Sequence, residues 1–233
     1  MKYRSKKAVF FDFGDTLAST DPPYMVRIAM AMRKAGYQIS DRDFEYEYCE
    51  ADYKLYLKHK SEGGISPDNH RDWFFPILYD SLTLPDSIDN FRREIRDIMR
   101  GIEFNRVALP GVVEILDYLK SGGYVLGVIS NNDGSTGDKC TEVGIREYFE
   151  LIIDSTNVGL IKPDSRIFAH ALENLGISPS EALHIGDLYG ADVMGATDAG
   201  VDVVWLNSRK FDKFDDSAVN EISDLSELKK LFS

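Results

Sequence analysis

The stretch Ala8-Val9-Phe10-Phe11-Asp12-Phe13-Gly14-Asp15-Thr16-Leu17 places a continuous apolar run directly before an aspartate. Later runs have the same form: residues 124–129 before Ser130, 151–153 before Asp154, 182–185 before Gly186-Asp187, and a last run at 201–206. Continuous apolar runs rich in Val and Ile are typical of parallel strands that are covered on both faces. The pattern therefore predicts a parallel sheet whose strands end in polar residues.

Helical patterns lie between these runs. Residues 110–120, 166–175 and 225–232 carry apolar side chains at helical spacing. The sequence Ser178-Pro179-Ser180-Glu181 offers an N-cap, a proline for the first helical position and a glutamate for a capping box, so we expect a short helix before the next strand. Strands that alternate with helices in this way predict an α/β fold with a doubly wound parallel sheet.

Residues 19–105 differ from the rest, because helical stretches at 25–34, 44–58 and 88–100 occur there without a strong strand run. We expect an inserted α-helical domain at 19–105 and an α/β core domain formed by 1–18 and 106–233. The joints are expected at the proline-containing segments 20–23 and 104–110. The insert carries aromatic residues that could line a substrate pocket or pack a small helical core: Tyr46, Tyr48, Tyr53, Tyr56 and Trp73.

The chain has 233 residues, of which 43% are hydrophobic, and its formal net charge is -12 at pH 7. This apolar share argues against a disordered chain, and no apolar run approaches the roughly 18 residues of a membrane span. The acidic charge disfavours nucleic acid as a partner, since no basic stripe compensates it. The basic N-terminal cluster lacks the apolar stretch of a secretory signal, so we expect a cytoplasmic protein. Cys49 and Cys140 show no spacing typical of a metal or redox pair.

Ligands of open parallel sheets bind beyond the carboxyl ends of the strands, where terminal polar residues converge. The residues expected to meet there are Asp12, Ser130, Lys162 and Asp187. Two carboxylates offer the oxygen ligands that Mg²⁺ prefers, and an ammonium group can neutralise the negative charge of a phosphoryl group. Each residue taken singly also has an ordinary explanation, such as a helix cap, a surface turn or a loop. Taken together, they favour a shared site for a divalent cation and a phosphate.

The four polar segments resemble the ordered motifs of the haloacid dehalogenase (HAD) superfamily. They are Asp12-Phe13-Gly14-Asp15-Thr16-Leu17, Ile129-Ser130-Asn131, Gly159-Leu160-Ile161-Lys162-Pro163-Asp164 and Gly186-Asp187-Leu188-Tyr189-Gly190-Ala191-Asp192. The resemblance covers the whole chain, and four motifs in order form a specific signal. It implies a Rossmann-like core, and the helical insert is similar to the type 1 cap of the superfamily's first subfamily.

The resemblance implies a magnesium-dependent phosphatase of small phosphorylated molecules. In such an enzyme Asp12 would attack phosphorus and carry a transient aspartyl-phosphate, which water then hydrolyses. The groups implied to hold or support the metal are Asp12, the backbone carbonyl of Gly14, Asp187 and, from beyond the direct ligands, Asp192. The residues implied to bind the phosphoryl group are Ser130 and Lys162, which would act in catalysis together with Asp12, and Asn131 is expected to orient the substrate.

The sequence departs from the family pattern at Gly14. Family phosphatases usually carry a second aspartate at this position, where it protonates the leaving oxygen and then activates water. Asp15 is a candidate substitute, although its side chain could instead point away and brace the turn. We expect an enzyme without the second acid to be slow on poor leaving groups.

Three alternatives follow from this departure. The superfamily's dehalogenases also lack the second acid, but they need no magnesium and lack the Gly186-Asp187 pair. Its phosphonatases form a Schiff base with a cap lysine, for which this chain offers Lys54, Lys58 and Lys60. The third alternative is a metal- and phosphate-binding module whose cap binds an unknown protein partner, with little turnover. His184 and Trp205, which lie in or beside apolar runs, are assigned to the core.

Overall fold

Strand β1 (Ala8–Phe11) lies in the middle of a six-stranded sheet with the order β5-β4-β1-β6-β7-β8. The computed structural model describes residues 2–84, 87–212, 214 and 219–232. The other strands of this sheet are β4 (Val125–Ser130), β5 (Leu151–Asp154), β6 (Ala182–Gly186), β7 (Asp202–Leu206) and β8 (Asn220–Ile222). All of its strand pairs are parallel, so the predicted parallel sheet is confirmed.

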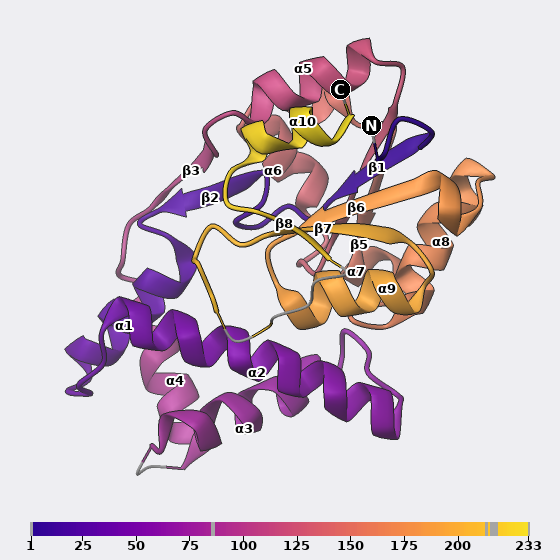
Figure 1. Cartoon of the computed structure of the whole chain (residues 1–233). Helices are drawn as coiled ribbons and strands as arrows, with labels where there is room; N and C mark the ends of the chain where they lie inside the picture. The colour runs from indigo at the N-terminus through magenta and orange to yellow at the C-terminus, as the bar shows by residue number, and fades with distance from the viewer. Residues whose placement is uncertain (1, 85–86, 213, 215–218, 233) are drawn as a thin grey trace.

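The order in which successive strands are added to the sheet reverses at β1. The chain first passes outward to β4 and β5, and it then returns to the opposite side of β1 with β6 (Figure 1). Phe11 therefore pairs with Val128 on one side and with Ile185 on the other. This arrangement leaves a crevice at the carboxyl ends of β1, β4 and β6, the position at which open α/β sheets bind ligands.

Side chains of β1 alternate between two buried apolar layers. Val9 and Phe11 pack into one cluster, and Ala8 and Phe10 pack into the other. The first cluster includes residues of α5 (Val112–Ser121) and α10 (Leu228–Phe232), and the second includes residues of α8 (Ser165–Leu175) and α9 (Gly195–Asp198). Helices thus cover both faces of the sheet, which confirms the doubly wound α/β fold.

Shorter elements connect the strands. They are α6 (Thr136–Glu142), α7 (Ser155–Val158), the 3₁₀ turns η1 (Arg146–Tyr148), η2 (Pro179–Glu181) and η4 (Leu225–Glu227), and the π-helical segment η3 (Tyr189–Met194). The helix expected at Ser178 is only the 3₁₀ turn η2. The Glu181 carboxylate accepts a hydrogen bond from the Ser178 backbone N–H at 2.8 Å, but β6 begins at the next residue and leaves no room for a longer helix.

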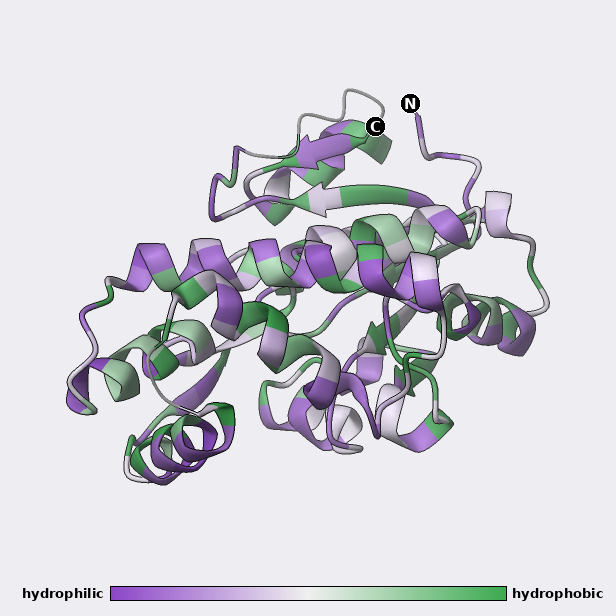
Figure 2. Cartoon of the chain, turned by 90° about the horizontal axis from the view of Figure 1, so that it is seen from below, coloured by the Kyte–Doolittle hydropathy of each residue, from purple (hydrophilic) through white to green (hydrophobic). Residues whose placement is uncertain are grey.

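A helical insert lies between β1 and β4, below the sheet in Figure 1. Its helices are α1 (Tyr24–Lys34), α2 (Asp41–Glu62), α3 (His70–Leu82) and α4 (Ile88–Met99). Figure 2 shows hydrophilic and hydrophobic residues interspersed along these helices, as expected when one face of each packs inward. No helix among the described residues combines the length and the apolar content that a membrane crossing requires.

Several elements were not predicted. Helix α3 contains Pro76 and apolar residues on several sides, so its sequence lacks a clean helical period. Strands β2 (Ala18–Asp21) and β3 (Asn105–Ala108) form a separate antiparallel ribbon, and they are short and largely polar. Strand β8 is also short and polar. The ribbon crosses both boundaries proposed between insert and core, so the division at 18/19 and 105/106 stays a prediction.

Gly127 allows β4 to pack beside β1. An added Cβ would lie 2.8 Å from Phe10 Cδ1 and 3.2 Å from the Leu151 carbonyl oxygen. We expect Gly127→Ala to lower the free energy of unfolding by about 1–3 kcal/mol, because the buried Phe10 ring would have to shift. Urea denaturation measures this change.

Gly137 in α6 provides the matched control, since an added Cβ there meets nothing within 4 Å. We expect Gly137→Ala to stabilise the chain by about 0.5–1 kcal/mol, because alanine restricts the unfolded chain more than glycine does. Equal effects of the two substitutions would contradict the proposed packing at Phe10.

Candidate active site

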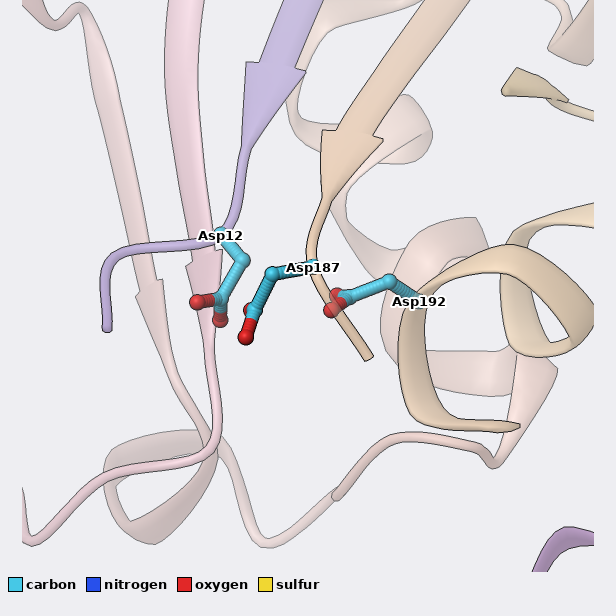
Figure 3. A group of neighbouring side chains, drawn as sticks. All are labelled: Asp12, Asp187 and Asp192. Atoms are coloured by element: carbon cyan, nitrogen blue, oxygen red, sulfur yellow. The ribbon is translucent and has the colours of Figure 1, made fainter. Parts of the chain in front are cut away.

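Three buried carboxylates meet at the carboxyl edge of the sheet. Asp12 directly follows β1, Asp187 directly follows β6, and Asp192 lies in η3 (Figure 3). One oxygen from each lies within 4.8 Å of the others. Their convergence follows from the parallel sheet, because the carboxyl ends of neighbouring strands open on the same crevice.

Lys162 binds two of these carboxylates from a side chain that is only 2% exposed. Its Nζ lies 2.6 Å from Asp12 Oδ1 and 2.7 Å from Asp192 Oδ1, and it donates a hydrogen bond to the Ile129 carbonyl at 2.8 Å. Burial opposes the charge on Lys162, but the two carboxylates raise its pKa above the ordinary value. The two carboxylates therefore favour the charged form of the Lys162 ammonium group.

The pKa values of Asp12 and Asp192 shift in opposite directions, although both carboxylates contact Lys162. Burial raises the pKa of Asp12 to about 6, although Lys162 acts in the opposite direction. Burial also acts on Asp192, but Lys162 and His184 outweigh it and lower the pKa of Asp192 to about 2. His184 Nε2 lies 2.9 Å from Asp192 Oδ1, and because an ionised carboxylate only accepts, this nitrogen carries the hydrogen. His184 is buried in the core, as assigned, and it also orients a site residue.

Asn131 fixes the loop that carries Lys162. Its Nδ2 donates to the Lys162 carbonyl at 2.9 Å, and its Oδ1 accepts from the Lys162 backbone N–H at 2.8 Å. Both ends of the Asn131 amide are thus hydrogen-bonded to the Lys162 backbone. The expected contact of Asn131 with substrate stays a prediction. Ser130 ends β4 and faces the same cavity.

Arg209 completes the site and was not anticipated. Its guanidinium forms ion pairs with Asp187 Oδ2 and Asp15 Oδ2, both at 2.6 Å. Burial raises the pKa of Asp187, while Arg209 counteracts that effect. Trp205, assigned to the core, is buried and donates its indole N–H to the Asp187 carbonyl at 3.0 Å. No motif marks Arg209 in the sequence, because it reaches the site from the loop after β7.

Asp15 braces the turn after β1. Its backbone is left-handed, with φ of 55°, and its Oδ1 accepts a hydrogen bond from Ser19 while Oδ2 pairs with Arg209. Of the two roles considered for Asp15, the geometry favours the bracing role. Gly14 beside it is open: an added Cβ would lie no closer than 4.0 Å to Asp12 Oδ2, and its φ is not positive. The space for a second acid is therefore present, but no side chain fills it.

A cavity of about 1080 Å³ lies between the strand ends and the helical insert. Asp12, Ser130, Lys162 and Asp187 line it from the core. Of the aromatic residues considered for a pocket, the described lining includes Tyr48 alone. Tyr53 instead packs against Phe214, with ring centroids 4.6 Å apart. The other three aromatic residues are also outside the described cavity lining: Tyr46, Tyr56 and Trp73.

Three lysines were candidates for a Schiff base. In the described part of the chain, each forms an ion pair outside the cavity lining: Lys54 with Glu50, Lys58 with Glu62 and Lys60 with Asp198. The geometry therefore gives no support to the phosphonatase alternative.

Asp52 of α2 attaches the insert to the core. Its buried carboxylate accepts hydrogen bonds from the backbone N–H groups of Gly190 at 2.6 Å and Ala191 at 3.2 Å. A side chain at position 190 would not fit, because an added Cβ on Gly190 would lie 2.5 Å from the Asp52 carbonyl oxygen. The insert thus contacts η3 directly before Asp192, and no sequence pattern indicated this contact.

Known proteins are similar to this chain in sequence and in fold. Residues 9–206 match the family described as haloacid dehalogenase-like hydrolase. A glyceraldehyde 3-phosphate phosphatase from Methanothermobacter thermautotrophicus is 32% identical, over 97% of this chain and 99% of that protein. A HAD phosphatase structure from Thermococcus onnurineus is 25% identical, with a TM-score of 0.60 over 97% of this chain and 98% of that one. A 2-haloacid dehalogenase structure from Pseudomonas syringae pv. Tomato DC3000 is also 25% identical, with a TM-score of 0.57 over 97% of both chains.

The chain belongs to the haloacid dehalogenase-like hydrolase family. The resemblance inferred from its four motifs is therefore confirmed, and the chain is a hydrolase with a Rossmann-like core. The helical insert between β2 and β3 is compatible with a type 1 cap.

Removal of the Lys162 charge tests the electrostatics of the site. We expect Lys162→Met to lower the free energy of unfolding by about 3–5 kcal/mol at neutral pH, because buried carboxylates lose their cation. Loss of Lys162 moves the native pKa of Asp12 further above the unfolded value of about 3.9, and it removes the main cation that lowers the native pKa of Asp192. A raised native pKa removes stability as pH rises through it, so the deficit is largest at neutral pH and smaller near pH 4–5. Urea denaturation at both pH values measures it.

Lys139→Met is the matched control. Lys139 also lines the cavity, but its partner Asp133 is 65% exposed, so we expect a loss below about 1 kcal/mol. A deficit for Lys162→Met that is no larger than the control, or that does not change with pH, would contradict the account.

Proposed function

We propose that the chain is a magnesium-dependent phosphatase that hydrolyses small phosphate monoesters through an aspartyl-phosphate on Asp12. The observation that carries the proposal is the contact of Lys162 Nζ with Asp12 Oδ1 at 2.6 Å, at the edge of the cavity. A cation beside a buried carboxylate favours the ionised form that a nucleophile requires. The archaeal phosphatase described above supports the choice of substrate class.

The carboxylate cluster fits a hard divalent cation. Asp12 and Asp187 would hold Mg²⁺ with the backbone carbonyl of Gly14, since oxygen ligands suit this ion. Asp192 would support the site from outside, because its oxygens already accept from Lys162, His184 and the Leu188 N–H. Bound Mg²⁺ would supply positive charge at the phosphoryl oxygens.

The protein residues then account for two displacement steps. An Asp12 carboxylate oxygen attacks phosphorus, and the bond from phosphorus to the ester oxygen breaks, so that the electron pair departs with that oxygen. Ser130 and Lys162 bind the phosphoryl oxygens. Water next attacks the phosphorus of the aspartyl-phosphate, which releases inorganic phosphate and restores Asp12.

Proton transfer to the leaving oxygen is the weak step of this proposal. Gly14 supplies no acid, and the Asp15 carboxylate is held by Ser19 and Arg209. Solvent must then protonate the leaving group in the open cavity. The preferred substrates are therefore phosphorylated compounds whose leaving oxygen needs no acid, such as aryl phosphate esters or acyl phosphates.

A second candidate function is metal-free hydrolysis of a carbon–halogen bond by the same Asp12. Arg209 compensates the charge of Asp187 at 2.6 Å, as this candidate requires, although the superfamily's dehalogenases lack the Gly186-Asp187 pair that this chain has. The similarity to a 2-haloacid dehalogenase supports the same candidate. Chelator separates the two: the dehalogenase would release halide from a 2-haloacid in excess chelator, whereas the phosphatase would be inactive.

Magnesium binding and turnover provide the first test of the proposed function. We expect Mg²⁺ to raise the melting temperature and to be required for phosphate release from an aryl phosphate. Asp187→Ala should remove most of the Mg²⁺-dependent shift, and Asp12→Asn should abolish turnover while the chain stays folded. Differential scanning fluorimetry and a phosphate-release assay measure these effects.

Asp133→Ala is the control for this test, because it removes a largely exposed carboxylate from the cavity lining. It should retain the Mg²⁺-dependent shift. Retained turnover in Asp12→Asn would refute the assigned nucleophile. Tight Mg²⁺ binding with no turnover of any phosphate ester would favour the binding-module alternative.

Restoring the missing acid tests the leaving-group argument. We expect Gly14→Asp to accelerate hydrolysis of an alkyl phosphate by about 10²–10⁴, with much less effect on an aryl phosphate, because general acid catalysis matters most for poor leaving groups. The open space at Gly14 admits the side chain. Steady-state kinetics on both esters measure the selectivity.

Gly14→Asn is the matched control, since it has nearly the same size but cannot donate the proton as an acid. It should leave the ratio between the two esters unchanged. If a folded Gly14→Asp enzyme keeps the native ratio as well, another group performs acid catalysis, and Asp15 is the first residue to substitute.

A further inference from the structure

Arg27 of α1 is a buried cation that lines the cavity and is only 6% exposed. Its Nη2 donates to Thr20 Oγ1 at 3.2 Å. Its Nε is buried and has no hydrogen-bond partner among the described residues. A guanidinium carries several donors in a rigid plane, so most of this capacity is unused by the protein.

The charge of Arg27 also lacks a counterion. Among the described residues, no carboxylate lies within ion-pair distance of its guanidinium. Its Cζ instead lies 3.9 Å from the centroid of the Phe104 ring and 5.8 Å from that of Tyr24. Burial lowers the pKa of Arg27, and the like charge of Arg106 adds to this effect. A buried cation with a cationic neighbour is unfavourable unless something else neutralises it.

The cavity that Arg27 lines contains both cations and carboxylates, and the charge of Arg106 acts directly on the pKa of Arg27. The net charge is -12, yet further arginines line the same cavity: Arg71, Arg92, Arg96 and Arg106. The cavity also contains a second buried polar atom without a partner in the described chain, Tyr79 Oη. These groups lie on the insert and its ribbon, whereas Asp12 and Lys162 lie at the sheet edge.

We propose that Arg27 forms a second oxyanion subsite, so that the substrate carries a carboxylate or a further phosphate in addition to the phosphoryl group at Asp12. The inference rests on the proposed function and specifies its substrate class. A planar guanidinium binds either oxyanion in a bidentate manner. The ligand would supply the counterion and the acceptor that the protein does not provide, and a phosphate ester without a second anionic group would leave the charge of Arg27 uncompensated.

The test compares substrates that differ only in the second anion. With Mg²⁺ present, kinetics are measured on 3-phosphoglycerate against glyceraldehyde 3-phosphate, which carries an aldehyde in place of the carboxylate. Fructose 1,6-bisphosphate against fructose 6-phosphate tests a second phosphate. We expect kcat/KM to be about tenfold or more higher for at least one anionic member over its partner, and the pair that responds identifies the anion.

Arg27→Met should lower kcat/KM for the preferred anionic substrate by about tenfold or more, mainly through KM, and change glyceraldehyde 3-phosphate by less than about twofold. Arg27→Lys should restore part of the loss, because it retains the charge. Arg33→Met is the matched control, since Arg33 lies on the same helix, pairs with Asp41 and is outside the described cavity lining. It should leave every substrate unchanged.

Calorimetric titration of 3-phosphoglycerate and fructose 1,6-bisphosphate into Asp12→Asn, with and without Arg27→Lys, provides a second readout that needs no turnover. Weaker binding of the preferred anion to the variant that combines Asp12→Asn with Arg27→Lys supports the subsite. This measurement can be made even if Arg27→Met does not fold. Equal kcat/KM for substrates with and without the second anion, or equal losses on both in Arg27→Met, overturns the inference and leaves the proposed phosphatase standing. Absence of phosphate release from an aryl phosphate as well as from these substrates, with Mg²⁺ bound, would instead refute the proposed function.

Discussion

The contact of Lys162 with two buried carboxylates is the interaction on which the site depends. Asp12 follows the central strand and Asp192 lies in η3, and the Lys162 ammonium group is within 2.7 Å of both. Without that cation, the sheet would bring like charges together in a region of low dielectric constant. With it, Asp12 can remain ionised at the edge of a cavity, which is the condition for nucleophilic attack.

Close backbone approaches maintain this arrangement. An added Cβ at Gly186 would lie 2.2 Å from Asp192 Cγ, so the carboxylate reaches Lys162 only because this position has no side chain. Asp52 then attaches the helical insert to the backbone next to Asp192. The insert is thus hydrogen-bonded to the segment that orients a site carboxylate.

Sequence patterns predicted the sheet and its terminal residues, because continuous apolar runs depend on local composition and parallel strands align their carboxyl ends. They did not indicate Arg209 or Asp52, whose contacts join segments far apart in the chain and follow no fixed spacing. Short polar strands such as β2 and helices without a clean period such as α3 were missed for a related reason. Their stability comes from tertiary contacts, which local propensity does not encode.

The most direct measurement of the central claim is a rapid acid quench of the chain with Mg²⁺ and a phosphate ester labelled in its phosphoryl group. Peptide mapping then locates any label that is covalently attached. The account predicts a transient label on the peptide that contains Asp12, which appears before free phosphate and is absent in Asp12→Asn. Phosphate release without a labelled peptide, or a label on another residue, would contradict it.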